Sequence, residues 1–550
     1  MPRLPDSGSQ LWVAMVQLMW NHPVVMRIRI STYSLVVGLA LCAIAGCNTG
    51  TDQNGPGTEQ PVTSLRRGNG GDPGTLDPSL AEDVHAFNVL RDLYEGLVTE
   101  APDGSIVPGV ASDWEISKDG LRYTFNLRDT ALWSNGDPVT ARDFAAGIRR
   151  VRSPGSQSSY AFLLYPLLNA REVIESRESI DKLGVRAIDE NTLEVELYAP
   201  AGHFLSVLAM PVAFPIHNSM GGEERSFADP AYFIGNGAYM LDEWRPGSVI
   251  RLRKNPRFRD AVNVSIQVVE YFPIVDSMTE LNMYRAGELD ITATIPPSMF
   301  EPLRAERPSE VRIAPSLALY YVALDLSESP MNIPMLRQAL SLAIDREKLV
   351  EIVGRGEKPA YGIVPDGVAG YRGARYDWQH LSPAERESRA NEAYLNAGYN
   401  DDNPLKFKLI YDTGDIHETV ALTLAAMWEA VLGAQVVLDE REWQYFLETR
   451  SQRDEWEAMR FAWFGDYNDA STFLDIFKGD SLQNLPGYAS EEYDELLRRA
   501  GMTLDQVQRA DLMTQAESIL LADSPVVPLY FFVSKHMVHP RVKNFDSNVL

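Results

Sequence analysis

The sequence predicts a mixed α/β fold, because strand-like and helix-like stretches alternate along the whole chain. Apolar residues make up 45% of the 550 residues, which is normal for a globular protein. Turn signals such as Asn-Gly separate many of these stretches. A chain of this length should form two or three domains.

The N-terminal segment has the pattern of an export signal. Arg27 and Arg29 form a basic region, and an apolar run from 35 to 45 follows it. This run is shorter than the ~20 residues that span a bilayer, so it fits a secretory signal peptide. The segment ends in Ile-Ala-Gly-Cys at Cys47, which resembles the bacterial lipobox, where the cysteine is acylated. An ordinary signal peptide with an incidental cysteine is the alternative.

We therefore expect 1–46 to be a signal peptide, with Met26 as an alternative start. Residues 47–61 would be the lipidated Cys47 and a flexible tether, because the stretch after Cys47 is rich in Gly, Thr, Gln, Asn and Pro. The only other cysteine is Cys42, so the folded body should contain no disulfide and no catalytic thiol. These features predict an extracytoplasmic lipoprotein, in the periplasm or at the cell surface, anchored to a membrane by acyl chains.

Charge and motifs exclude several classes of function. The formal net charge is -26, so the chain repels phosphate and no nucleic-acid partner is expected. Phosphate-binding loops, His-Glu-x-x-His, Gly-x-Ser-x-Gly and thiol nucleophiles are all absent from the sequence. We therefore expect no enzyme, no metal and no cofactor, and a secreted hydrolase is the less favoured alternative.

The first half of the body alternates between helices and strands. Apolar residues of 84–97 recur on one helical face, and those of 121–127 alternate as in a half-buried strand. Thr140 and Asp143 have the spacing of a capping box, which predicts the start of another helix. Further strands are predicted at 193–197, 238–241 and 249–253.

The second half continues this alternation. Pro334 begins a predicted helix whose apolar residues recur as far as Val350. A strand at 407–411 precedes a helix at 420–432, and Gly433 ends that helix in the C-cap role. The last predicted elements are a strand at 436–438, amphipathic helices at 491–499 and 505–521, and a strand at 526–532.

The stretch from Met459 to Asp469 combines a buried strand with two opposite charges. Arg460 lies inside the strand-like part, and Asp466 lies where the strand should end. In a regular strand their even spacing would place both on one face, roughly 20 Å apart. Such a face could hold a ligand that carries both charges. The alternative is that Arg460 and Asp466 are two ordinary ion-paired residues at a strand edge.

Five separated motifs follow one another along the body: Tyr123–Arg128, Trp133–Phe144, Asn236–Tyr239, Leu252–Pro256 and Arg337–Arg346. Together they resemble the peptide/nickel-binding family of extracellular solute-binding proteins, which serve ABC importers. The oligopeptide-binding members are the most similar. The resemblance covers about 65 to 539 in order, nearly the whole body.

The resemblance implies a two-lobed periplasmic-binding-protein fold with an additional third domain. The two lobes of such a fold close over a ligand about a hinge. Lobe I would be discontinuous, domain II would be an accessory domain, and lobe III would be continuous. The implied ranges are 62–95, 220–275 and 534–550 for lobe I, 96–219 for domain II, and 276–533 for lobe III.

The resemblance also implies roles for the two charges. Asp466 matches the residue that pairs with the α-ammonium of a peptide, through a charge-assisted hydrogen bond. Arg460, Arg450 and His417 match positions that meet the C-terminal carboxylate, each for a different ligand length. A surface charge is the alternative for Arg450, and a solvated or capping role is the alternative for His417.

Other residues of the implied site line the cavity or face it. The backbone of 462–465 should pair with the ligand like an added strand, which tolerates many sequences. Trp443 could instead belong to the core. The implied residues are Trp443, Trp463 and Tyr160 in the lining, Ala462, Phe464 and Gly465 in the pairing strand, and Glu82 and Val84 on the opposite lobe.

The function implied is a monomeric, lipid-anchored receptor that binds short peptides and delivers them to an ABC permease. The same fold could instead bind murein peptides, dipeptides or another small solute. Glu328 stands where the compared family member has a lysine near the ligand. This difference weakens the expectation for one ligand length.

Overall fold

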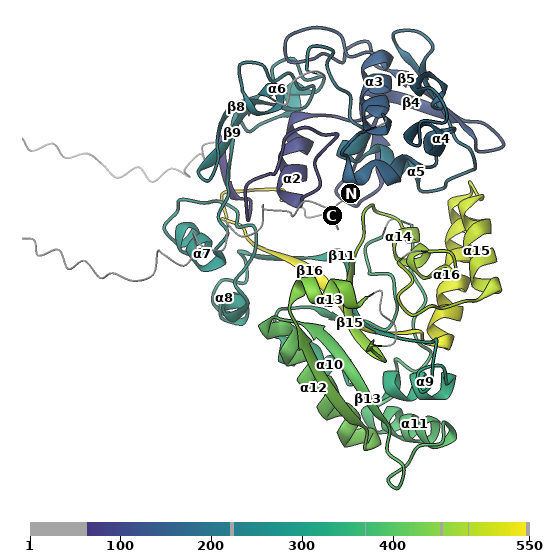
Figure 1. Cartoon of the computed structure of the whole chain (residues 1–550). Coiled ribbons are helices and arrows are strands. Elements are labelled where there is room, and N and C mark those ends of the chain that lie inside the picture. Colours follow the sequence, from purple (N-terminus) through teal and green to yellow (C-terminus); the bar gives the residue numbers. More distant parts are fainter. Residues whose placement is uncertain are drawn as a thin grey trace, which may run out of the picture. The chain divides into compact units, whose positions relative to one another are not determined.

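Within the part of the chain that the structure describes, the strands form four sheets (Figure 1). The structure is a computed structural model, and 61–550 forms one unit in it. The expected signal peptide, Cys47 and the tether lie outside the described residues. The described ranges are 63–153, 155–220, 225–368, 370–450, 455–481 and 483–545.

One four-stranded sheet has the order β1-β10-β9-β8 and is antiparallel except for the pair of β1 and β10. Asp83 caps α2 by accepting a hydrogen bond from the Ala86 N–H at 2.8 Å. The helix ends at Leu93, earlier than predicted, because Tyr94 has an extended backbone. The bounds are β1 (Ser64–Gly68), α2 (Val84–Leu93), β8 (Tyr239–Arg245), β9 (Val249–Lys254) and β10 (Val268–Phe272).

A second four-stranded sheet has the order β4-β5-β7-β6 and is antiparallel. The predicted capping box begins α3, since Thr140 N–H and Oγ1–H both donate to Asp143 Oδ2, at 2.8 and 2.9 Å. The bounds are β4 (Ala111–Ile116), β5 (Arg122–Leu127), α3 (Ala141–Arg152), α4 (Ala170–Ile174), β6 (Val185–Ala187), β7 (Thr192–Glu196), α5 (Phe204–Leu208) and α6 (Arg225–Ala228), with the hairpin β2 (Val98–Glu100) and β3 (Ile106–Pro108) preceding them.

The six-stranded sheet contains the strand that was predicted from Met459 onward. Its order is β12-β16-β11-β15-β13-β14, and β13 is parallel to both of its neighbours. The bounds are β11 (Val311–Leu324), β12 (Lys358–Pro359), β13 (Lys406–Asp412), β14 (Gln435–Arg441), β15 (Ala458–Phe464) and β16 (Val526–Met537).

The helices of this half follow the prediction with two differences. The helix predicted from Pro334 to Val350 is two helices, because Asp345 caps a new start by accepting from Lys348 N–H at 3.1 Å. The helix that Gly433 ends begins at Asp415, before the predicted residue 420. The bounds are α7 (Ser277–Arg285), α8 (Phe300–Glu306), α9 (Pro334–Leu342), α10 (Arg346–Val353), α11 (Pro383–Asn396), α12 (Asp415–Leu432), α13 (Trp443–Thr449), α14 (Ser471–Leu474), α15 (Glu491–Gly501) and α16 (Gln506–Asp523).

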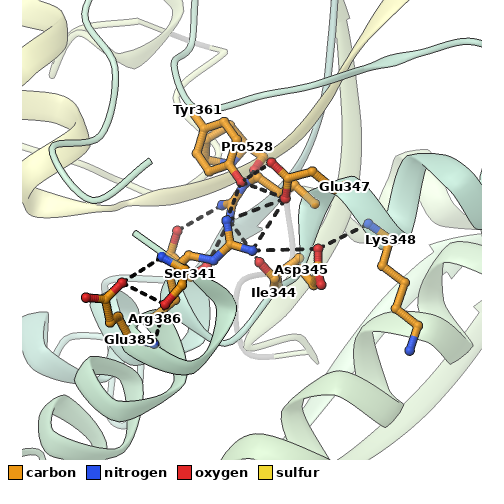
Figure 2. A network of polar contacts seen from close by, with 11 residues as sticks. Ser341, Ile344, Asp345, Glu347, Lys348, Tyr361, Glu385, Arg386 and Pro528 are labelled. Carbon is orange, nitrogen blue, oxygen red and sulfur yellow. Dashed lines mark hydrogen bonds and ion pairs between the residues drawn. The ribbon is translucent and has the colours of Figure 1, made fainter. Parts of the chain in front are cut away.

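Buried arginines join α10 to the large sheet and α11 to α10. Arg346 is fully buried and donates from Nε to the Pro528 carbonyl of β16 at 2.8 Å. Figure 2 shows Arg386 beside Glu347 and Tyr361, and its Nη1 donates to the Tyr361 hydroxyl at 2.6 Å. Each buried guanidinium has hydrogen-bond partners, so its burial does not leave it unsatisfied. These contacts therefore hold α10 and α11 in place.

The mixed α/β content confirms the predicted fold class. The division into lobes and an accessory domain stays a prediction. Among the described helices, none combines the length and apolarity that a membrane span requires.

Candidate functional site

Strand β15, predicted from Met459 onward, has one edge that is only partly paired. It pairs with β11 along its whole length, from Ala458 to Phe464. On the other side, β13 pairs only with Ala458 and Met459. In the described part of the chain, the edge from Arg460 to Phe464 therefore has no neighbouring strand.

The backbone groups that face this open edge follow from strand alternation. The Gly465 N–H donates to the Leu317 carbonyl of β11 at 2.7 Å. Successive residues of a strand point their N–H and C=O groups to opposite edges, so Trp463 also faces β11. Ala462 and Phe464 then present their backbone groups to the open edge. The Gly465 N–H, in contrast, is already used within the protein.

Asp466 lies two residues beyond the end of β15. Because the strand ends at Phe464, the regular spacing expected between Arg460 and Asp466 does not extend to Asp466. Its N–H donates to Thr472 Oγ1 at 3.1 Å. Burial raises the pKa of the Asp466 carboxyl to about 6. In the described ranges, this carboxylate has no cation within 4 Å, although a partly buried charge ordinarily needs one.

Tyr160, another predicted site residue, lies in the electrostatic field of both Asp466 and Glu82. The pKa of Tyr160 is raised by burial first, and then by the negative charges of Asp466 and Glu82. The Ser159 hydroxyl donates to Glu82, and the Tyr160 ring packs edge-on against Phe87 at 5.7 Å. Tyr160 is thus within electrostatic range of Asp466 and Glu82. Val84, at the start of α2, is 58% exposed.

Arg460 already has partners within the protein. Its Nη1 donates to Asp412 Oδ1 at 2.9 Å, and its Nη2 lies 2.8 Å from Nε2 of His417. The guanidinium carbon lies 4.7 Å from the centre of the Tyr320 ring. Arg460 and His417 thus lie together, and the charge of Arg460 is neutralised by Asp412.

His417 is neutral in this cluster. Burial, followed by the charge of Arg460, lowers its pKa to about 4. A neutral imidazole whose Nε2 accepts from Arg460 must carry its proton on Nδ1. That N–H then donates to the Tyr320 hydroxyl, 3.0 Å away. His417 lies in the first turn of α12, and its side chain contacts two partners, Arg460 and Tyr320.

Arg450 contacts other residues than Arg460 and His417 do. Its Nη2 donates to Gln483 Oε1 at 3.1 Å, and its guanidinium carbon lies 4.7 Å from the centre of the Phe461 ring. Burial lowers the pKa of Arg450. Within the described residues, no carboxylate lies within 4 Å of its guanidinium nitrogens. Glu328 is exposed in the turn after β11.

The aromatic residues expected in the lining have distinct environments. Trp443 is 49% exposed and stacks on Phe446 at 5.9 Å, so it is not a core residue. Trp463 packs against the core. Phe464 is 61% exposed and contacts Phe532 at a ring distance of 5.2 Å.

Two residues beside the predicted site were not predicted from the sequence. Asp412 directly follows the predicted strand at 407–411, and a carboxylate at a strand end was the available signal. Phe532 is the last residue of the predicted strand at 526–532, and no pattern there indicates that it contacts Phe464.

A strand with an open edge and separate opposite charges is suited to hold a ligand, not to transform it. In the described part of the chain, no cluster of His, Cys, Asp or Glu could hold a metal ion. These features fit a protein that binds a solute. The chain belongs to the bacterial extracellular solute-binding proteins, family 5, because the model of the middle region of that family matches residues 105–484.

Known relatives extend over nearly the whole chain. The periplasmic oligopeptide-binding protein OppA of Salmonella typhimurium is 36% identical, covering 94% of this chain and 96% of that protein. The probable deoxycholate-binding periplasmic protein YgiS of Escherichia coli is 36% identical, covering 88% of this chain and 91% of that protein. A solved structure of the periplasmic murein tripeptide-binding protein MppA, in its unliganded open form, has a TM-score of 0.81 at 33% identity. It covers 87% of this chain and 93% of that one.

These comparisons confirm the family resemblance and the periplasmic-binding-protein fold. They also confirm that the chain is a binding protein and not an enzyme, since the family and its relatives are binding proteins. The roles of the individual site residues stay predictions.

Proposed function

We propose that this protein is an extracytoplasmic receptor for short peptides. The observation that carries the proposal is that, among the described residues, the edge of β15 lacks a neighbouring strand and the Asp466 carboxylate just beyond it has no cation within 4 Å. A peptide can hydrogen-bond to the edge as an added strand, using Ala462 and Phe464. Its α-ammonium then supplies the cation that Asp466 lacks.

The opposite end of the peptide meets the second charge of the site. Arg450 has no carboxylate partner within 4 Å in the described ranges, so a C-terminal carboxylate can bind it without displacing an ion pair. Arg460 and His417 are available to a carboxylate only if the contact between Arg460 and Asp412 rearranges. Exposed aromatic rings at Trp443 and Phe464 can contact apolar side chains of the ligand.

The cellular role follows from the family and from the N-terminal segment. A solute-binding protein delivers its ligand to the permease of an ABC importer, and we assign this role to the present chain. The lipobox-like sequence at Cys47 would attach the receptor to a membrane, and the tether would leave its body free to bind. We expect a monomer that acts in the periplasm or at the cell surface.

Relatives with other ligands supply the alternatives. Murein peptides and dipeptides also carry an ammonium group, so Asp466 would bind them in the same way. Deoxycholate carries a carboxylate and no ammonium, so it would leave the Asp466 carboxylate unpaired at the site, which favours a peptide.

Isothermal titration with defined ligands tests the proposal. We expect tripeptides and tetrapeptides with free termini to bind, and Asp466→Ala to weaken their binding by about a hundredfold, as loss of a charge-assisted contact predicts. Native mass spectrometry of the purified protein should detect co-purified peptides. Binding of deoxycholate without binding of any peptide would contradict the proposal.

A further inference from the structure

Asp466 lies at a point where the chain passes between two hydrophobic cores. Ala458 and Met459 of β15 belong to one core, together with Ala470 and Phe473. Tyr467, directly after Asp466, belongs to another core, whose other buried members all lie between 76 and 271. The three residues after Asp466 are each fixed by a contact from a distant part of the chain.

The first contact is made by Tyr467. Its side chain is buried, and its ring stacks on His203 with 5.0 Å between centroids and 17° between planes. His203 directly precedes α5. Burial lowers the pKa of His203 to about 4, so the ring is neutral at pH 7 and the contact is a stack between two uncharged rings.

The second contact is made by Asn468. Its side chain is buried, and its Nδ2 donates to the Gly104 carbonyl at 2.9 Å. Gly104 lies in the turn between β2 and β3 with a φ of +80°. A Cβ atom at this position would lie 2.2 Å from Asn468 Nδ2, so the close approach requires glycine.

The third contact is an ion pair. Both carboxylate oxygens of Asp469 accept from Arg509, at 2.6 and 2.7 Å. Burial acts to raise the pKa of Asp469, but the Arg509 charge outweighs it and the pKa is lowered. A Cβ atom on Gly202 would lie 2.3 Å from Arg509 Nε, so the arginine itself packs beside the residue that precedes His203.

We propose that His203 and Gly104 are positioning residues for the ammonium site, because they hold the backbone that presents Asp466 to the ligand. The inference rests on the proposed function. Neither residue is in the segment 276–533 that contains Asp466, and both are in the segment 96–219. The segment 96–219 thus contributes to ligand binding, because its contacts hold Tyr467 and Asn468 in place. Without this hold, Asp466 moves relative to the open edge of β15, and a bound ammonium loses its charge-assisted contact.

The test compares the tripeptide Ala-Phe-Ala with its N-acetylated form, each by isothermal titration. The ratio of the two dissociation constants measures how much the protein gains from the ammonium group. We expect His203→Ala and Gly104→Ala to reduce this ratio about tenfold, as partial loss of one charged hydrogen bond predicts. A purely structural role would weaken both peptides equally and leave the ratio unchanged.

Two controls sharpen the test. His203→Phe keeps a ring against Tyr467 and should restore the ratio of the unmodified protein. Gly287→Ala imposes similar backbone strain at a φ of +74°, but its Cβ atom meets nothing within 4 Å, so the ratio should not change. If His203→Ala and Gly104→Ala keep the ratio within about twofold, the inference is overturned. If the unmodified protein binds both peptides equally, the proposed ammonium site itself fails, and the inference falls with it.

Discussion

The Arg460 guanidinium donates to the Asp412 carboxylate at 2.9 Å, so the cation in the middle of β15 already has an anion within the protein. Ile410 of β13 lies opposite Met459, so Asp412, the last residue of β13, lies one residue beyond the position opposite Arg460. The pair is mostly buried, with side-chain exposures of 12% for Arg460 and 10% for Asp412. Because Asp412 is its partner, Arg460 has a structural role in the site.

Replacing Asp412 should therefore destabilise the protein. Asp412→Asn leaves the Arg460 charge without its anion, and we expect the free energy of unfolding to fall by roughly 1–3 kcal/mol. Urea denaturation measures this change. Asp439→Asn is the matched control, because Asp439 accepts from Arg441 at 3.0 Å but its side chain is 31% exposed. An equal loss in both variants would show that burial of the Arg460 pair is not the cause.

Arg450 should contribute more to ligand affinity than to stability. We expect Arg450→Gln to lower the preference for a free C-terminus over a C-terminal amide by about tenfold, since one charged contact to the carboxylate is lost. Titration of a tripeptide and its amide measures the preference. Arg389→Gln, at an exposed position on α11, should leave it unchanged. An unchanged preference in Arg450→Gln would assign the carboxylate to another cation.

Asp466 should lower stability at neutral pH in the absence of ligand. Burial raises its folded-state pKa to about 6, whereas the pKa of an aspartate in an unfolded chain is about 3.9. The folded protein therefore binds the proton more tightly, and its stability falls as the pH rises from about 4 to 6. Asp466→Asn removes this cost, and we expect it to raise the free energy of unfolding by roughly 1–3 kcal/mol at pH 8, with no gain at pH 4.

Urea denaturation across this pH range checks the sign. Asp511→Asn, on the exposed face of α16, is the control and should shift stability equally at both pH values. Asp475, whose pKa burial also raises to about 6, titrates in all variants and cancels in the comparison. A gain for Asp466→Asn that is larger at pH 4 than at pH 8 would reverse the assignment.

Local patterns in the sequence predicted most elements of the fold, because strands and helices repeat their apolar residues at short range. The capping box at Thr140 and the end of a helix at Gly433 could be predicted for the same reason. The pairing of Arg460 with Asp412 could not be predicted from the sequence, because the two residues come from different strands and are 48 positions apart.

The contact between Asn468 and Gly104 was hidden for a similar reason, since 364 positions separate the two residues. The resemblance to a family identified Asp466 as a candidate. It could not indicate which residues hold Asp466 in place, because those contacts join side chains from separate parts of the chain.

The open edge of β15 gives a residue-level signature of peptide binding. Gly465 N–H donates to Leu317, so alternation directs the Ala462 and Phe464 amides away from β11. Without ligand these two amides should exchange with solvent quickly, whereas Trp463 and Gly465 should be protected. A bound peptide adds a strand, and we expect it to slow exchange at Ala462 and Phe464 about tenfold or more, while the other two amides change little.

Hydrogen exchange with residue-level fragmentation measures the four amides with and without a saturating tripeptide. A tripeptide methylated on its backbone nitrogens is the matched ligand, because it keeps both termini but cannot donate to the β15 carbonyls. We expect this ligand to bind more weakly and to protect Ala462 and Phe464 less. Uniform protection of all four amides by either ligand would instead indicate a general stiffening of the strand. The peptide would then be held by its two charged ends, without the added strand that the open edge of β15 makes possible.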